Sequence, residues 1–168
     1  MVAELLDSVE LAVFERLIDV GKLLERRADR ATREHIGLKY VQYEVLIRLR
    51  NAGGELRMTE LANKLVSTPS GQTYQLAQLE KAGLAERVIA PGDERGVLAR
   101  ITEKGRTLLR EVSQHQNDMI VEAVIAPLTR EQVEAAHRIL GALQLHLRGE
   151  ETGGLIPANL PVHTSSRE

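Results

Sequence analysis

The feature that most constrains this fold is a long segment without proline near the N-terminus, residues 5–33. Its apolar side chains recur every seven positions in two rows, Leu6, Val13 and Val20 and then Leu17 and Leu24. A seven-residue apolar period is typical of a helix that packs along another helix. We therefore predict one long helix whose apolar stripe is wide enough to be buried against another chain.

Shorter elements follow a break at Gly37. The apolar pattern predicts helices over residues 38–50, 59–65 and 69–82, strands over 85–89 and 97–101, and helices over 102–126 and 129–147. Between the two strands, residues 90–96 are rich in Gly, Pro and Asp, which predicts a turn at a hairpin tip.

Helix boundaries can be predicted from single residues. Gly83 is a typical C-terminal glycine for the helix over residues 69–82. Thr102 can cap the helix that follows the hairpin. Thr129 and Gln132 have the spacing of a capping box, which predicts the start of the last helix.

Composition narrows the class of protein. The chain of 168 residues has no cysteine, which excludes disulfides, thiolate metal sites and thiol nucleophiles. Aromatic residues are few, so the core must be built from aliphatic side chains. No apolar run reaches the ~18–20 residues of a membrane span, and the acidic N-terminus is unlike a secretory signal. We expect a cytoplasmic protein with no membrane partner.

The order of the predicted elements is a long helix, three helices, a hairpin and two long helices. A helix, a turn, a second helix and a hairpin is the order of a winged helix-turn-helix. We therefore predict a mainly α fold with a small β-hairpin wing. The predicted segments are an N-terminal dimerisation helix (1–36), a winged helix-turn-helix DNA-binding domain (38–101), C-terminal dimerisation helices (102–148) and a flexible tail (149–168).

Three motifs in the middle of the chain resemble those of one family. Residues 79–87 read Leu-Glu-Lys-Ala-Gly-Leu-Ala-Glu-Arg, residues 93–95 read Asp-Glu-Arg, and residues 101–105 read Ile-Thr-Glu-Lys-Gly. They are similar to the Leu-Glu-x-x-Gly-Leu-x-x-Arg, Asp-x-Arg and Leu-Thr-x-x-Gly motifs of the MarR (multiple antibiotic resistance regulator) family. The motif resemblance covers about residues 38–106.

This resemblance implies a recognition helix at about residues 69–82 and a wing at about 85–101. If Gln72, Leu76 and Leu79 face inward, the rest of the helix presents small or neutral polar groups that can bond phosphates or base edges. The predicted DNA-binding residues are Ser70, Gly71, Thr73, Tyr74, Gln75, Gln78, Asp93 and Arg95. Gln78 suits adenine in the major groove, and Arg95 suits a narrow minor groove.

The resemblance also implies a homodimeric repressor that binds a pseudo-palindromic operator in double-stranded DNA. A small aromatic or phenolic ligand would release it, in a pocket near Phe14, His35, Tyr40 and Tyr43. Each of those four residues can also be read as a core or boundary residue. No cofactor or metal site is predicted, although Glu111 and His115 are one helical turn apart.

The charge balance leaves a second function open. Residues 55–105 contain seven basic and seven acidic side chains, whereas DNA-binding domains usually carry an excess of positive charge. The alternative is a helical dimer that uses a winged fold to bind another protein. An enzyme is not predicted, because the sequence has no phosphate loop, dinucleotide glycine motif, His-Glu-x-x-His motif or nucleophile elbow.

Overall fold

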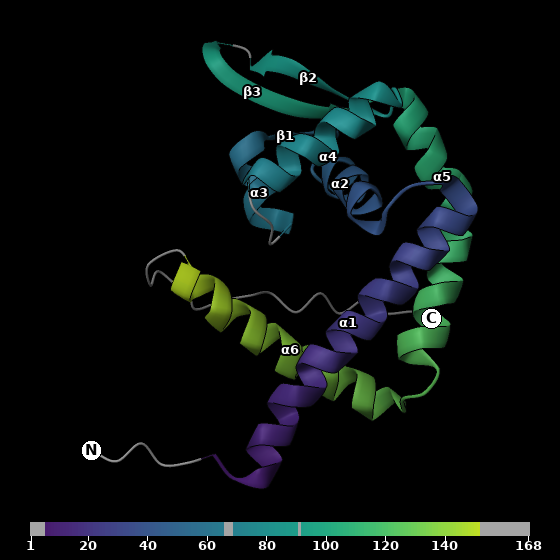
Figure 1. Cartoon of the computed structure of the whole chain (residues 1–168), viewed down its shortest axis with the longest axis vertical. Coiled ribbons are helices and arrows are strands. Elements are labelled where there is room, and N and C mark those ends of the chain that lie inside the picture. The colour runs from purple at the N-terminus through teal and green to yellow at the C-terminus, as the bar shows by residue number, and fades with distance from the viewer. Residues whose placement is uncertain (1–5, 66–68, 91, 152–168) are drawn as a thin grey trace, which may run out of the picture. The chain divides into compact units, whose positions relative to one another are not determined.

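The computed structural model describes residues 6–65, 69–90 and 92–151. They form α1 (Ser8–Ile36), α2 (Tyr40–Asn51), β1 (Glu55–Arg57), α3 (Met58–Leu65), α4 (Pro69–Lys81), β2 (Ala85–Ala90), β3 (Asp93–Ile101), α5 (Glu103–Ile120), the π-helical turn η1 (Val121–Ile125) and α6 (Arg130–Glu151) (Figure 1). The mainly helical fold with a small antiparallel sheet confirms the predicted class. Within these ranges, none of the helices combines the length and apolar character that a membrane span needs.

The chain divides into two compact units, Met1–Ala123 and Val124–Glu168. The first unit contains α1 to α5 and the sheet, and the second contains α6. Helix α6 continues to Glu151, past the predicted end at about Leu147. The rest of the predicted tail lies outside the described residues.

Helix α1 begins and ends at local signals. Asp7 Oδ1 accepts hydrogen bonds from two backbone N–H groups of the first turn (2.7 and 2.9 Å), and the Glu10 carboxylate accepts one from the Asp7 N–H (2.8 Å). This reciprocal capping box starts the helix at Ser8. At the other end Gly37 has a φ of 69°, and its N–H donates to the Arg33 carbonyl (3.0 Å).

The predicted helix starts at Thr102 and Thr129 are confirmed. Thr102 Oγ1 accepts a hydrogen bond from the Gly105 N–H (3.1 Å) at the start of α5. Thr129 and Gln132 bond reciprocally: the Thr129 N–H donates to Gln132 Oε1 (2.8 Å), and the Gln132 N–H donates to Thr129 Oγ1 (3.3 Å). Gly83 follows α4 with a φ of 69°, as expected of a C-terminal glycine.

The sheet has the strand order β1-β3-β2, and every pair is antiparallel. Strands β2 and β3 form the predicted hairpin. Strand β1 is not predicted by the sequence pattern, and it pairs with the far end of β3, Arg57 opposite Leu98. Only three residues long, β1 is too short to show an alternating pattern.

The predicted turn over residues 90–96 is wrong in its length. Strand β3 already begins at Asp93, which lies opposite Ala90 after a shift of register at Ile89/Ala90. Strand β3 therefore starts four residues earlier than predicted, and β2 ends one residue later than predicted. Gly96 lies inside β3 rather than in a loop.

The core of the first unit is aliphatic, as expected. It gathers side chains from α2, α3, α4, the sheet and α5, and the largest fully buried ones include Leu46, Leu49, Leu61, Leu76, Leu79 and Leu109. Helix α1 packs against α2 and α5. This core fixes α4 against α3 and the sheet, and so determines which face of α4 stays exposed.

Candidate nucleic-acid interface

Helix α4 has the two faces that the sequence predicts. Gln72, Leu76 and Leu79 are buried, with Gln72 only 2% exposed. On the other side Ser70 and Thr73 are exposed and Tyr74 is 58% exposed. The remaining predicted positions of this helix, Gly71, Gln75 and Gln78, are partly buried.

Gln72 is a polar residue on the buried face of α4. Its Nε2 donates a hydrogen bond to the backbone carbonyl of Leu61 in α3 (3.4 Å). The amide thus links the two helices of the helix-turn-helix. A buried amide needs such a partner, because desolvation without one is costly.

Glu80 and Arg87, two fixed positions of the residue 79–87 motif, brace α4 against β2. Arg87 donates to Glu80 through its backbone N–H (3.0 Å) and through Nη1 (2.7 Å). Its Nη2 also donates to the Thr73 carbonyl in the middle of α4 (2.9 Å). One guanidinium therefore holds the helix along almost two turns, with the forked geometry that arginine provides.

The Thr-x-x-Gly segment at 102–105 fixes the C-terminal end of α4. Thr102 Oγ1 donates to the Gly83 carbonyl (2.7 Å), and Lys104 Nζ donates to the Ala82 carbonyl (2.8 Å). Both side chains satisfy carbonyls that a helix end leaves open. Gly105 lies so near the backbone that a Cβ there would overlap the Leu84 carbonyl oxygen.

An ion pair joins β1 to the tip of the wing. Arg57 Nη1, from β1, bonds Asp93 Oδ2 at the start of β3 (2.9 Å). The Asp93 carboxylate raises the pKa of Arg57 above its ordinary value, mainly through this hydrogen bond. Arg95 is a residue of β3, but its side chain lies outside the described part of the structure. Its predicted contact with DNA stays a prediction.

Ion pairing explains how a DNA-binding surface is compatible with a neutral charge balance. Acidic residues of the winged part bond basic residues of the same fold: Glu80 with Arg87, Asp93 with Arg57, and Glu55 with Arg100 (2.9 Å). Glu80 is the one carboxylate in α4, and it points to Arg87. The exposed face of α4 therefore presents hydroxyl and amide groups without a carboxylate that would repel phosphate.

Two clefts flank α1 in the first unit. The first, of about 1030 Å³, lies between α1 and α5 and includes Leu24, His35, His115 and Met119. The two imidazole rings are in contact, with centroids 4.2 Å apart. An ion pair also joins Arg27 of α1 to Glu122 of η1, the turn that follows α5 (2.9 Å).

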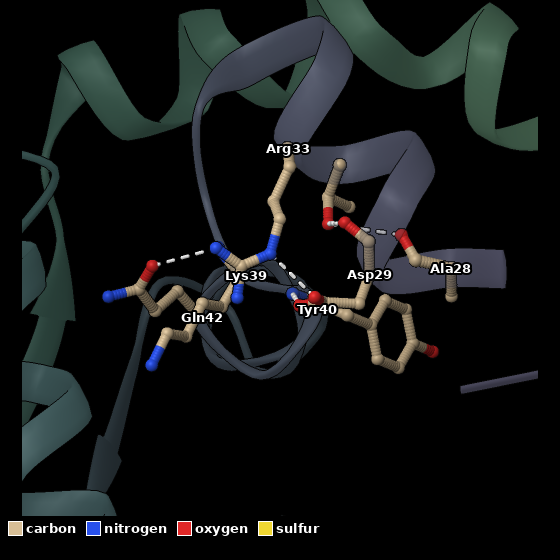
Figure 2. Close-up of polar contacts among 7 residues, drawn as sticks. Ala28, Asp29, Arg33, Lys39, Tyr40 and Gln42 are labelled. Atoms are coloured by element: carbon tan, nitrogen blue, oxygen red, sulfur yellow. Dashed lines mark hydrogen bonds and ion pairs between the residues drawn. The ribbon is translucent and has the colours of Figure 1, made fainter. Parts of the chain in front are cut away.

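The second cleft, of about 1100 Å³, is lined from α1, α2, the end of α3 and α4. Figure 2 shows part of its wall, where Arg33 and the backbone N–H of Tyr40 meet at the Asp29 carboxylate. The distances are 2.6 Å from Arg33 Nε and 3.0 Å from the Tyr40 N–H. These bonds, the one from Arg33 first, lower the pKa of Asp29. Burial raises the pKa of Tyr40.

The residues predicted for a ligand pocket do not converge in one cleft. His35 lines the first cleft and Tyr40 the second. Tyr43 packs on the core beside Tyr40, with ring centroids 6.3 Å apart. Phe14 is 61% exposed on α1 and lines neither cleft. Sequence reasoning missed Gln75 as a cleft residue, although it lies four positions from the buried Leu79.

The fold and the braced, carboxylate-free face of α4 define a winged helix-turn-helix regulator. The MarR family model matches residues 38–97. Sco3205, a MarR family transcriptional regulator from Streptomyces coelicolor solved in complex with DNA, is 32% identical with a TM-score of 0.83, covering 92% of this chain and 96% of that one. The chain belongs to the MarR family of transcriptional regulators.

Other relatives agree with this assignment. AbsC, a MarR family transcriptional regulator from Streptomyces coelicolor, is 27% identical with a TM-score of 0.80, and the match covers 88% of this chain and 99% of that one. The HTH-type transcriptional regulator PecS of Dickeya dadantii is 27% identical over 84% of this chain and 86% of its own length. These similar proteins are thus regulators of transcription.

Proposed function

We propose that the protein is a homodimeric repressor that binds a pseudo-palindromic operator in double-stranded DNA through α4 and the β2–β3 wing, and that a small aromatic ligand releases it. The observation that carries this proposal is the exposed face of α4. It combines hydroxyl and amide side chains with a rigid support from Arg87. The complex of Sco3205 with DNA, in a relative of the same fold, supports the same reading.

The chemistry of this face suits a major groove. Ser70 and Thr73 carry hydroxyl groups that can bond phosphates, and Gln78 can donate to and accept from one adenine. Ser70 and Gly71 also lie in the first turn of α4, where the helix dipole favours phosphate. Arg95, in the β3 half of the hairpin, suits the adjacent minor groove.

Exposed apolar side chains support the homodimer. In α1, Val13, Leu17 and Val20 are 51%, 40% and 52% exposed, and they belong to the seven-residue rows. In α6, Leu140 and Leu147 are also at least half exposed. Exposed apolar side chains in regular rows are typical of an interface, and a twofold dimer would cover the same helices of both copies.

The second cleft is the site we favour for the ligand, because Gln75 connects it to α4. Gln75 Oε1 is buried and has no hydrogen-bond partner among the described residues. A phenolic hydroxyl placed in the cleft would donate to it, beside the half-buried ring of Tyr40. Ligand binding would then act directly on the helix that contacts DNA.

Two substitutions test the DNA contacts in a gel-shift assay with the DNA upstream of the protein's own gene. We expect Arg95→Ala to weaken binding by about 1–3 kcal/mol and Gln78→Ala to relax the choice between operator sequences. Arg130→Ala, an exposed arginine of α6, and Gln114→Ala, an exposed glutamine of α5, are the matched controls. Wild-type affinity and selectivity in both test variants would contradict the proposal and favour a protein partner.

The ligand site is tested with a matched pair of probes, 4-hydroxybenzoate and benzoate. We expect the phenolic probe to release DNA at a lower concentration, and Gln75→Leu to remove that difference. Equal release by both probes, or an unchanged difference in Gln75→Leu, would contradict this site.

A further inference from the structure

Arg57 connects the start of the helix-turn-helix to the tip of the wing. Its backbone N–H donates to Glu60 Oε2 (3.2 Å) at the beginning of α3. Its side chain extends from the end of β1 to Asp93, where Nη1 and Oδ2 are 2.9 Å apart. Arg57 therefore bonds both the start of α3 and the tip of the wing, and its partner in the wing is 36 positions away in sequence.

The outer part of the wing is less well supported, because β3 has only one neighbouring strand there. Strand β1 pairs only with Leu98–Arg100 of β3. Beyond Leu98, towards the tip, β3 is paired with β2 alone. A two-stranded ribbon by itself is marginally stable in water. The Arg57–Asp93 pair crosses from β1 to this ribbon just where backbone pairing with β1 has ended.

The Asp93 carboxylate lies close to Gly96. A Cβ added at Gly96 would be 2.6 Å from Asp93 Oδ2 and 3.0 Å from the Ala90 Cβ. The carboxylate thus lies directly over the Gly96 backbone, with the same Oδ2 that accepts from Arg57. A side chain at residue 96 would have to displace the carboxylate that bonds Arg57.

We propose that Arg57 is a positioning residue for the wing, which orders the β2–β3 tip through Asp93 before DNA binds. The inference rests on the proposed binding of DNA through the wing. Ordering the ribbon in the free protein lowers the entropy lost on binding. Arg57 acts through Asp93, and its contribution therefore depends on the Asp93 carboxylate.

A double-mutant cycle separates positioning from a direct contact between Arg57 and phosphate. The full-length chain, Arg57→Met, Asp93→Asn and the double variant are compared for operator affinity at one salt concentration. We expect Arg57→Met to weaken binding about threefold to fivefold in the wild type and by less than about 1.5-fold in Asp93→Asn. An equal loss in both backgrounds, or no loss in either, would overturn the inference.

Amide hydrogen exchange of the free protein gives a readout that needs no DNA. We expect Arg57→Met to speed exchange at the β2–β3 tip, with α3 and α5 unchanged. Arg100→Met is the matched control, since it removes an exposed ion pair of similar accessibility from the same sheet. It should leave the tip unchanged. Global unfolding is not expected, because exposed ion pairs contribute little stability.

The two assays also separate this inference from the proposed function. If the wild-type chain binds no duplex with preference, the proposed function fails, and the positioning of a DNA-binding wing fails with it. If the wild type binds an operator but exchange at the tip is unchanged in Arg57→Met, only the positioning role of Arg57 is overturned.

Discussion

The winged part of the chain and helix α1 bury their apolar side chains in different ways. Between α2 and β3 the large leucines are buried within one chain, and Leu61 and Leu79 are fully inaccessible. Along α1, by contrast, Phe14 and Leu17 remain 61% and 40% exposed. Both regions have strong apolar periodicity. Among the described residues, the apolar face of the winged part is buried within the chain, whereas these side chains of α1 are exposed.

We infer from this difference that the two regions have separate tasks, DNA binding for the winged part and association of two copies for α1. The winged part presents α4 on a core that is built within one chain. Helix α1 leaves its apolar rows open, and association of two copies would cover them. In the proposed dimer, α1 and α6 would set the spacing between the two copies of α4, and α4 and the wing would supply the contacts with DNA.

The largest effect is expected when aspartate replaces leucines of the exposed apolar rows. Leu17→Asp combined with Leu140→Asp should give monomeric or unfolded protein, because each buried leucine contributes roughly 1.5–3 kcal/mol and a buried charge is costly. Sedimentation analysis measures the outcome. Ile89→Asp is the matched control, since Ile89 is exposed in the wing and should leave the dimer intact. Normal dimers of the double variant would contradict the proposed interface.

A core substitution in the winged part should act on stability instead. Leu79→Ala is expected to lower the free energy of unfolding by about 2–5 kcal/mol, because Leu79 is fully buried in the aliphatic core. Thermal melting measures the loss, and sedimentation below the melting range should still show dimers. Dissociation without a lower melting temperature would show that the two regions are not separate.

A smaller loss is expected at the junction of the wing and α5. Gly105→Ala places a methyl group against the Leu84 carbonyl and 2.8 Å from Ile101 Cγ1, so we expect a loss of about 1–3 kcal/mol in chemical unfolding. Gly21→Ala in α1 is the control, because no atom lies within 4 Å of the added Cβ. It should gain up to about 1 kcal/mol. Equal effects would contradict the close packing at Gly105.

The smallest effect is expected at the junction of α1 and α2. The pKa of Asp29 is lowered in the folded state, so its stabilising contribution is present above its ordinary pKa of 3.8 and is lost as the pH falls through the lowered value. Asp29→Asn should therefore destabilise near neutral pH by less than about 1 kcal/mol and have no effect in strong acid. Urea unfolding at several pH values measures this, and a loss that persists in strong acid would contradict the assignment.

Much of the fold could be predicted because its signals are local. The caps at Thr102 and Thr129 involve residues three positions apart, and the burial of Gln72, Leu76 and Leu79 follows from helical periodicity. Such patterns are fixed by the geometry of one helix. The motifs of residues 79–87 and 101–105 indicated the family. In the structure, their side chains hold α4 against β2 and against the start of α5.

The contacts that could not be predicted join distant segments. Strand β1 is defined only by its partner in β3, and the bond from Arg57 to Asp93 spans 36 positions. The early start of β3 comes from the pairing of Asp93 with Ala90, whereas the composition of residues 90–96 indicates a turn. The division of His35 and Tyr40 between two clefts likewise depends on how α1, α2 and α5 pack.

We propose that two identical copies of the chain bind DNA as a symmetric pair. Selection from a pool of random-sequence duplexes by the full-length protein, followed by sequencing of the bound fraction, tests it most directly. We expect the enriched duplexes to share a pseudo-palindrome with half-sites about one helical turn apart, ~10 bp. Enrichment of a single asymmetric half-site, or no enrichment at all, would contradict it.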